Sequence, residues 1–268
     1  MNRFNGKTVV VTGAARGTGE ATARRLAAEG AHVLLLDVLD ERGEAVAQSL
    51  GDRAAFMHAD VTQAEDWAAA ARDIEERWGR CDALVNNAAI LELATVEHQD
   101  RAALERVLAV NLVGPFLGIQ AFLPLLRAVR GNIVNVGSID SFSAFAATAA
   151  YTSSKFALRG LTKTVALEEA QHGVRCNLVC PGGGNFEMIA ESLGRAAFTL
   201  PTDLPAGTAG ESLPPLGRHA KLDEIAAAIA FFASEDASFC TGTELLVDGG
   251  LHAGTLVDVP GIFRSRPS

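Results

Sequence analysis

Short apolar runs alternate with longer amphipathic segments along most of the chain. The apolar runs predict strands at Lys7–Thr12, His32–Leu36, Ala54–His58, Ala83–Asn86, Asn132–Val136, Val174–Val179 and Thr243–Val247. The segments between them predict helices at Thr18–Glu29, Glu41–Leu50, Gln63–Trp78, Tyr151–Gln171 and Asp223–Ser234, and a long helix that ends before Gly131. Apolar strands joined by helical crossovers are typical of a parallel sheet that helices cover on both faces. The pattern therefore predicts an α/β fold with a seven-stranded, doubly wound parallel sheet.

No change in composition divides the chain, so we expect residues 1–268 to form one domain. The least regular region spans about 182–216 and is rich in Gly, Pro, Thr and Leu. A long irregular excursion inside a domain is usually functional, which predicts a substrate lid here. The C-terminal tail at about 251–268 is expected to be loose or to pack on a partner subunit.

An uncharged stretch from Val107 to Leu126 has the length of a membrane span. It contains the prolines Pro115 and Pro124 and the amides of Asn111 and Gln120, which make an isolated span unfavourable. We expect instead a helix that neighbours cover on nearly all sides, and no membrane partner.

Composition excludes several classes of protein. Hydrophobic residues make up 49% of the chain and charged residues 21%, which indicates a globular protein and not a disordered one. The net charge of −9 disfavours a nucleic-acid partner, because nucleic-acid binders need a basic face. Cys176 and Cys180 lack the spacing of redox or zinc pairs, and no metal site is expected. Buried thiols and the absence of a signal-peptide pattern at the first residues predict a cytoplasmic location.

A glycine-rich loop follows the first predicted strand and leads directly into a helix. Its sequence, Thr12-Gly13-Ala14-Ala15-Arg16-Gly17-Thr18-Gly19, has the spacing G-x-x-x-G-x-G. Glycines permit a close approach of backbone to phosphate, and the helix N-terminus offers free N–H groups and a positive dipole end. The position between strand and helix predicts a Rossmann-type dinucleotide site. The loop residues predicted to bind the cofactor are Gly13, Arg16, Gly17, Thr18 and Gly19.

The second predicted strand leads to Asp37, which lies 18 residues after Gly19. A carboxylate at this place can accept both hydroxyls of the adenosine ribose and would repel a 2′-phosphate. This favours NAD over NADP, although an exposed acid at a strand end remains the alternative. Arg16 argues in the opposite direction, because an arginine in this loop can reach a 2′-phosphate and permit some use of NADP. Asp60 and Val61 are expected to hold the adenine edge.

The only tyrosine of the chain, Tyr151, lies four residues before Lys155 and 13 residues after Ser138. Asn86-Asn87-Ala88-Ala89 follows the fourth predicted strand, and Asn111 lies in the long helix. Together with the glycine loop, these motifs resemble the short-chain dehydrogenase/reductase family over nearly the whole chain, to about Gly250. The resemblance implies an oxidoreductase that uses a nicotinamide cofactor.

The chemistry of a hydroxyl oxidation explains the Tyr151–Lys155 pair. Residues four apart share one face of a helix. A free phenol has a pKa near 10, and an ammonium group and an oxidised nicotinamide beside it favour the phenolate. Lowering the pKa by about three units requires roughly 4 kcal/mol, which a neighbouring charge in a partly dry site supplies. Tyr151 is thereby predicted to exchange a proton with the substrate oxygen.

The resemblance implies roles for the other motif residues. Ser138 would bind the substrate oxygen, and Lys155 would also bind the nicotinamide ribose. Asn111 would hold a water that links Lys155 to solvent, although an amide that satisfies a local helix kink is the alternative. Asn86 would join the first and fourth strands. The remaining residues expected around the cofactor are Asn87, Ala88, Pro181 and Gly182, together with Tyr151 and Lys155.

The residues after Ser138 and in the lid are expected to face the substrate. Ser138, Asp140, Phe145, Tyr151 and Phe186 are the predicted substrate contacts, with Phe142, Met188 and Ile189 as further candidates. Their apolar character predicts a hydrophobic cyclic secondary alcohol or ketone, although these residues could equally form local core. Asp140 could bind the second hydroxyl of a diol or could be a solvated loop acid.

The run from Pro181 to Asn185 resembles the P-G-G-x-N of bacterial cis-dihydrodiol dehydrogenases of the family, which makes dihydrodiols candidates beside steroids. In the same run, Gly184 and Phe186 stand where the family often has an aliphatic residue and a threonine. Alternative functions are an NADPH-dependent ketone or 3-oxoacyl reductase and a catalytically silent nucleotide-binding member. The resemblance also implies a homotetramer or homodimer formed through the uncharged helices.

Overall fold

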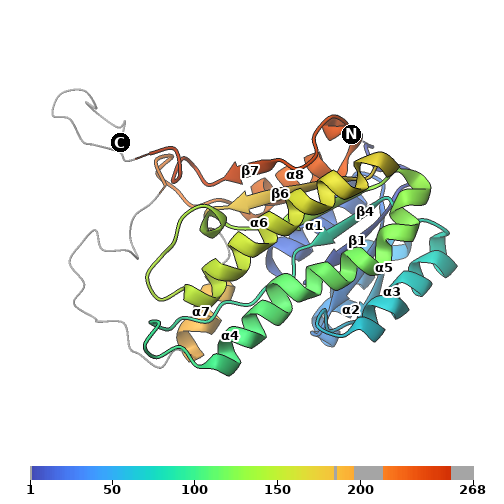
Figure 1. Cartoon of the computed structure of the whole chain (residues 1–268). Helices are drawn as coiled ribbons and strands as arrows, with labels where there is room; N and C mark the ends of the chain where they lie inside the picture. The colour runs from blue at the N-terminus through green and yellow to red at the C-terminus, as the bar shows by residue number, and fades with distance from the viewer. Residues whose placement is uncertain (1, 184–185, 196–213, 255–268) are drawn as a thin grey trace.

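Seven parallel strands form the sheet that the apolar runs predict (Figure 1). The structure, a computed structural model, describes residues 2–183, 186–195 and 214–254. Its strands are β1 (Thr8–Thr12), β2 (His32–Asp37), β3 (Ala54–His58), β4 (Ala83–Asn86), β5 (Asn132–Val136), β6 (Arg175–Pro181) and β7 (Glu244–Val247). They are arranged in the order β3-β2-β1-β4-β5-β6-β7, and every neighbouring pair is parallel. The doubly wound fold class is thereby confirmed.

The direction in which strands are added reverses between β1 and β4. The chain adds β2 and β3 on one side of β1 and then begins again with β4 on the other side. In open parallel sheets a crevice forms at such a reversal, outside the carboxyl ends of the strands. The topology therefore places the ends of β1 and β4, and the loops that follow them, at the expected binding site.

Helices cover both faces of the sheet. One layer contains α1 (Gly17–Ala28), α2 (Asp40–Leu50) and α8 (Leu222–Ala233), and the other contains α3 (Ala64–Trp78), α5 (Gly114–Val129) and α6 (Ala149–Glu169). Successive residues of a strand point to opposite faces. Val9 and Val11 accordingly pack in the first layer, whereas Val10 packs in the second. This explains why strands that are buried on both faces are apolar at nearly every position.

The long uncharged helix is interrupted and is less covered than the sequence predicts. It consists of α4 (Arg101–Leu108), a π-helical turn at Ala109–Val113 and α5. By length and composition the whole run could cross a membrane, with a mean hydropathy of 1.7 in its most apolar part, but 39% of that part is buried within the chain. Core helices pass the same test, and Phe122 is completely buried. The expectation of cover on nearly all sides was wrong, because Val113 and Phe116 face outward and are exposed.

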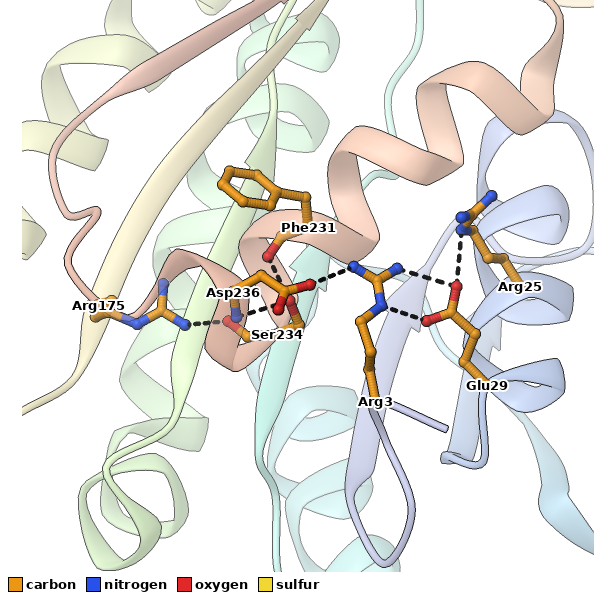
Figure 2. A network of polar contacts seen from close by, with 7 residues as sticks. All are labelled: Arg3, Arg25, Glu29, Arg175, Phe231, Ser234 and Asp236. Atoms are coloured by element: carbon orange, nitrogen blue, oxygen red, sulfur yellow. Dashed lines mark hydrogen bonds and ion pairs between the residues drawn. The ribbon is translucent and has the colours of Figure 1, made fainter. Parts of the chain in front are cut away.

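Polar contacts hold the first residues of the chain against the amino ends of the strands. Figure 2 shows Arg3 between Glu29 at the end of α1 and Asp236 just after α8, at 2.6 and 3.0 Å. Arg175 donates to the carbonyl oxygen of Ser234 at 2.9 Å and continues the network to β6. This network lies at the edge of the sheet opposite to the carboxyl ends, so it supports the fold without entering the crevice.

One further helix, α7 (Phe186–Arg195), lies within the region predicted as a lid. In Figure 1 it lies near the start of α4, on the opposite side of the molecule from the N-terminus. Residues 184–185, 196–213 and 255–268 lie outside the described residues, so the full lid and the tail stay predictions. The four cysteines are free thiols, and three of them are buried.

Candidate active site

A cavity of about 390 Å³ lies at the carboxyl ends of β1, β2 and β4, where the strand order reverses. Eight of the residues predicted to hold the cofactor line it: Gly13, Arg16, Thr18, Asp37, Asp60, Val61, Asn87 and Ala88. Gly17 and Gly19 belong to the same loop without lining the cavity. The structure therefore gathers these residues from four separate segments of the sequence around one cavity.

The glycine loop packs too closely for side chains. Gly13 has a φ of 63°, and a Cβ atom there would lie 2.9 Å from the Cα atom of Ala88. A Cβ atom on Gly19 would lie 1.9 Å from the carbonyl oxygen of Gly13. The absence of side chains leaves the backbone and the first turn of α1 open to the cavity. This arrangement fits the pyrophosphate of a dinucleotide, which needs N–H groups of the backbone at close range.

Asp37 has a structural task in addition to the one the sequence predicts. Its carboxylate accepts hydrogen bonds from the backbone N–H groups of Ala15 at 2.9 Å and Leu39 at 3.1 Å. The side chain thus ties the glycine loop to the end of β2 while it lines the cavity. Each carboxylate oxygen can accept a further hydrogen bond, so the two ribose hydroxyls of a nucleotide can still be bound.

Asn87, and not Asn86, joins the ends of the first and fourth strands. The amide of Asn87 donates to the carbonyl oxygen of Thr12 at 2.9 Å, and its backbone N–H donates to the Thr12 hydroxyl at 2.9 Å. Asn86 is the last residue of β4 and donates to the side chain of Asn135 on β5 at 2.9 Å. The expectation for Asn86 was wrong, because the side chain of this residue crosses to the other neighbouring strand.

A second cavity of about 180 Å³ continues from the first. Its polar lining includes Ser138, Asp140, Tyr151 and Lys155, and Pro181 also lines it. Five residues line both cavities: Thr18, Asn87, Ala89, Leu91 and Met188. Gly182, expected beside the cofactor, does not line either cavity, whereas its neighbour Gly183 does. The predicted acid/base residues therefore stand at one end of the predicted dinucleotide site.

Tyr151 and Lys155 both lie on the buried side of α6. The ammonium group of Lys155 is 5.4 Å from the centre of the Tyr151 ring and donates to the carbonyl oxygen of Val136 at 2.8 Å. Burial lowers the pKa of Lys155 to about 8 and raises the pKa of Tyr151 above its usual value. Both shifts disfavour the charged forms, so the surroundings must supply positive charge before Tyr151 can act as a base.

Asp140 is connected directly to Ser138. The Ser138 hydroxyl donates to one oxygen of the Asp140 carboxylate at 2.9 Å, and the Thr152 hydroxyl donates to the other at 2.9 Å. Asp140 is buried, so it is not the solvated loop acid considered above. After burial, the negative charge of Asp140 is the second cause of the raised pKa of Tyr151, while the hydrogen bond with Ser138 lowers that pKa.

Comparison with known proteins identifies the family to which this chain belongs. The profile of the family described as enoyl-(acyl carrier protein) reductase matches residues 13–252. A 3-alpha-(or 20-beta)-hydroxysteroid dehydrogenase of Mycobacterium tuberculosis is 41% identical over 94% of this chain and 92% of that protein. The chain belongs to the short-chain dehydrogenase/reductase family. It is therefore an oxidoreductase whose family uses a nicotinamide cofactor.

Two further relatives of this short-chain dehydrogenase/reductase carry the names of alicyclic alcohol dehydrogenases. A trans-4-hydroxycyclohexanecarboxylate dehydrogenase of Sinomonas cyclohexanicum is 38% identical over 94% of this chain and 95% of that protein. A cyclopentanol dehydrogenase of a Comamonas species is 40% identical, with 94% of this chain and all of that protein covered. All three relatives are named for the oxidation of a hydroxyl group.

Asn111 lies in the π-helical turn of this dehydrogenase/reductase and is almost completely buried. Its side-chain oxygen accepts the backbone N–H of Ile90 at 2.9 Å, and its amide donates to the carbonyl oxygen of Ile90 at 2.9 Å and to the Ser154 hydroxyl at 3.0 Å. These bonds join the π-helical turn to the loop after β4 and to α6, and none of them satisfies a backbone group of the kinked helix itself, so the alternative of a local kink was wrong. The water-holding role stays a prediction.

The expected substrate contacts are only partly assembled. Phe145 is half exposed and does not line the second cavity, because the chain reaches the surface at residues 144–146, beyond the buried 3₁₀ turn that follows Ser138. Phe142 packs instead beneath Arg159, whose guanidinium lies 4.2 Å from its ring centre. The side chain of Phe186 lies outside the described residues.

Met188 and Ile189 of α7 do line the second cavity, as the sequence suggests. Sequence reasoning missed Leu91, Ile139 and Ile225, which supply further apolar lining from three other segments. No motif marks these residues, since each belongs to an ordinary apolar pattern. The result is a mostly apolar chamber in which the polar groups cluster around Ser138 and Tyr151.

Proposed function

We propose that this protein is an NAD-dependent dehydrogenase of hydrophobic cyclic secondary alcohols. One observation carries the proposal: Ser138, Tyr151 and Lys155 meet in an apolar chamber that continues into the cavity lined by Asp37. An apolar chamber with a few convergent polar groups is typical of sites for hydrophobic ligands. The three relatives, named for steroid and alicyclic alcohols, support the same substrate class.

Each polar residue of the chamber has a distinct role in the proposal. When bound, an oxidised nicotinamide supplies the hydride acceptor and a positive charge near the phenol. Tyr151 accepts the proton of the substrate hydroxyl and returns it in the reverse direction. Ser138 turns its hydroxyl from Asp140, to which it donates in the structure, toward the substrate oxygen and holds that oxygen by a hydrogen bond. Lys155 stabilises the phenolate form of Tyr151, because its ammonium group lies 5.4 Å from the ring centre.

A screen of alcohols with NAD tests the proposed substrate class. We expect NADH to form with cyclopentanol, substituted cyclohexanols, hydroxysteroids or cis-dihydrodiols, and at least tenfold more slowly with linear alcohols of similar size, since a hydroxyl on a rigid ring loses less conformational freedom when it is oriented. Absorbance of NADH measures the rate. Absence of turnover with every cyclic alcohol, despite binding of NADH, would favour the catalytically silent alternative.

Asp37 is expected to decide between NAD and NADP by its charge. Replacing Asp37 with Asn keeps an acceptor for the N–H of Ala15, which lies 2.9 Å away, but removes the negative charge. We expect the preference for NAD to narrow on the order of tenfold, because the repulsion of a 2′-phosphate is lost. The ratio of kcat/KM for the two cofactors measures the change.

The substitution Asp37→Ala serves as the comparison for Asp37→Asn. It removes the charge and also the anchor of the glycine loop, so binding of both cofactors should weaken more than in the Asn variant. Equal rates with NAD and NADP in the native protein would show that Asp37 does not set the preference.

The charge of Asp140 is expected to shift the pH profile of the reaction. Asp140 raises the pKa of Tyr151, so Asp140→Asn should lower that pKa. The rising limb of alcohol oxidation against pH should consequently move to lower pH by about half to one unit. Steady-state rates over a pH series measure the shift.

Thr152→Val is the matched control for Asp140→Asn. It removes the other hydrogen bond of the Asp140 carboxylate, which measures 2.9 Å, without changing the charge. The rising limb of the rate of alcohol oxidation against pH should then stay at nearly the same pH as in the native protein. A limb that moves to higher pH in Asp140→Asn would contradict the electrostatic role.

We further propose that copies of this chain assemble through α5, α6 and the π-helical turn, and that the protein is cytoplasmic. The exposed apolar side chains of α5, α6 and the π-helical turn include Val113, Phe116, Phe156 and Leu167. Exposed apolar groups of this kind are typical of protein–protein interfaces, which supports a homodimer or homotetramer. Analytical ultracentrifugation of the full chain tests the assembly.

A further inference from the structure

The helix α7 is joined to the glycine loop by ion pairs. Arg16 forms a two-pronged pair with the carboxylate of Glu191, in which the second guanidinium nitrogen is 2.9 Å from the second oxygen. Glu187, one turn earlier on α7, lies 3.1 Å from Arg16 and 2.7 Å from Arg42 of α2. Two glutamates of α7 therefore pair with Arg16 of the glycine loop and with Arg42 of α2.

These pairs lie where the adenosine ribose of a dinucleotide would be bound. Arg16 and Glu191 line the first cavity together with Asp37, Val38 and Leu39 at the end of β2. A 2′-phosphate is attached to the same ribose that Asp37 is proposed to bind. It would consequently meet Arg16 at this end of the cavity.

Glu191 and a 2′-phosphate would compete for the same N–H groups of Arg16. Guanidinium groups bind carboxylates and phosphates through the same two parallel N–H groups. Glu191 already uses two N–H groups of Arg16, so a phosphate would have to displace it or bind the remaining edge. Glu187 forms a second ion pair with the same guanidinium group and also pairs with Arg42.

The charges of the cluster also oppose a phosphate. Arg16 and Arg42 contribute two positive charges, whereas Asp37, Glu187 and Glu191 contribute three negative ones. A 2′-phosphate brings between one and a half and two further negative charges at neutral pH. The cluster is therefore net negative, although it contains the arginine that would argue for NADP.

We propose that Glu187 and Glu191 are specificity-determining residues that exclude NADP by neutralising and occupying Arg16 and Arg42. The inference rests on the proposed use of NAD and extends it, because it assigns cofactor selectivity to a helix that also lines the substrate chamber. Asp37 repels the phosphate directly, and the two glutamates withdraw the cations that would otherwise compensate for it.

Direct binding of NADH and NADPH tests this role without any substrate. The native protein and the variant Glu187→Gln/Glu191→Gln are titrated with each nucleotide, and nicotinamide fluorescence reports Kd. We expect the ratio of the two Kd values to shift toward NADPH on the order of tenfold in the variant, since two neutralised carboxylates release Arg16 and Arg42. Adding Arg16→Gln to this variant should remove most of the gain.

Glu20→Gln is the matched control for the loss of one negative charge in either single variant. Glu20 lies on the neighbouring helix α1 and pairs with Arg24 at 2.8 Å, without an ion pair to Arg16 or Arg42. Its removal should leave the ratio of NADH to NADPH affinity unchanged. The single variants Glu187→Gln and Glu191→Gln should each give part of the shift.

Two results would overturn the inference. If both affinities fall together and their ratio stays constant, the glutamates only anchor α7 and do not select the cofactor. If Glu20→Gln shifts the ratio as much as either single variant, the effect comes from overall charge. Failure of the native protein to bind either nucleotide would instead remove the proposed function itself, so the two failures are distinguishable.

Discussion

Replacing Tyr151 with phenylalanine should lower the rate of alcohol oxidation by about 10²- to 10⁴-fold, the range typical of a lost general acid/base. The variant removes one oxygen atom and leaves the ring in a buried position of α6. The affinity for NADH should be nearly unchanged, because most of the proposed cofactor contacts lie in the other cavity. Single-turnover rates and a fluorescence titration measure the two quantities separately.

The single tyrosine of the chain makes the proposed ionisation directly observable. Burial raises the pKa of Tyr151, so the phenol of the protein alone should ionise above its usual pH range. Saturating NAD should shift this ionisation to lower pH, because a positive charge is added near the phenol. Near-ultraviolet difference absorbance follows the phenolate, and Tyr151→Phe provides the blank.

Two outcomes would contradict this account of Tyr151. Residual turnover within tenfold of the native rate in Tyr151→Phe would remove the residue from the role of proton acceptor. An ionisation that does not respond to NAD would show that the cofactor binds away from the phenol. Either outcome leaves the family membership intact, since that rests on the whole chain.

Replacing Gly19 with alanine should nearly abolish nucleotide binding. The new Cβ atom would lie 1.9 Å from the carbonyl oxygen of Gly13 and 2.6 Å from the side-chain nitrogen of Asn87. The first of these is a backbone atom inside the loop, so the loop itself has to open. We expect affinity for NADH to fall by roughly 100-fold or more and stability to fall by about 1–3 kcal/mol, the usual cost of overpacking.

Gly160→Ala is the matched control for Gly19→Ala. Gly160 lies inside α6, and a Cβ atom there would meet no atom of the described residues within 4 Å, apart from its chain neighbours and the backbone of its own helix. Affinity for NADH should be unchanged, and stability should rise by about 0.5–1 kcal/mol, because alanine favours a helix more than glycine does. Urea unfolding and NADH titration measure both effects. Native affinity in Gly19→Ala would mean that the loop does not form the nucleotide site.

Features that depend on neighbours in the sequence could be predicted from the residues alone. The apolar runs identified all seven strands, since a strand buried on both faces must be apolar at nearly every position. The glycine loop and the Tyr151–Lys155 pair were also predictable. A loop between strand and helix, and two residues four apart on a helix, have local geometries that any folded context preserves.

Contacts between distant segments could not be predicted in this way. The pairing of Arg16 with Glu191 joins residues 175 positions apart, and nothing in either local pattern points to the other. The sequence left two interpretations of Asp140, as a residue that binds a second substrate hydroxyl or as a solvated loop acid. The structure showed that its carboxylate accepts hydrogen bonds from Ser138 and Thr152. The direction of a polar side chain at a turn depends on which partners the fold brings close to it.

The sequence by itself determined the fold class, the positions of the strands and of the glycine loop along the chain, and the residues that we propose for the acid/base chemistry. Only the tertiary structure decided that Asn87 joins the strand ends in place of Asn86, that Phe145 is half exposed and does not line the chamber, and that the long uncharged helix exposes part of its surface. Periodicity specifies which positions are buried along one element, because it reflects the local backbone repeat. It does not specify which element covers another, because that depends on packing between segments far apart in the sequence.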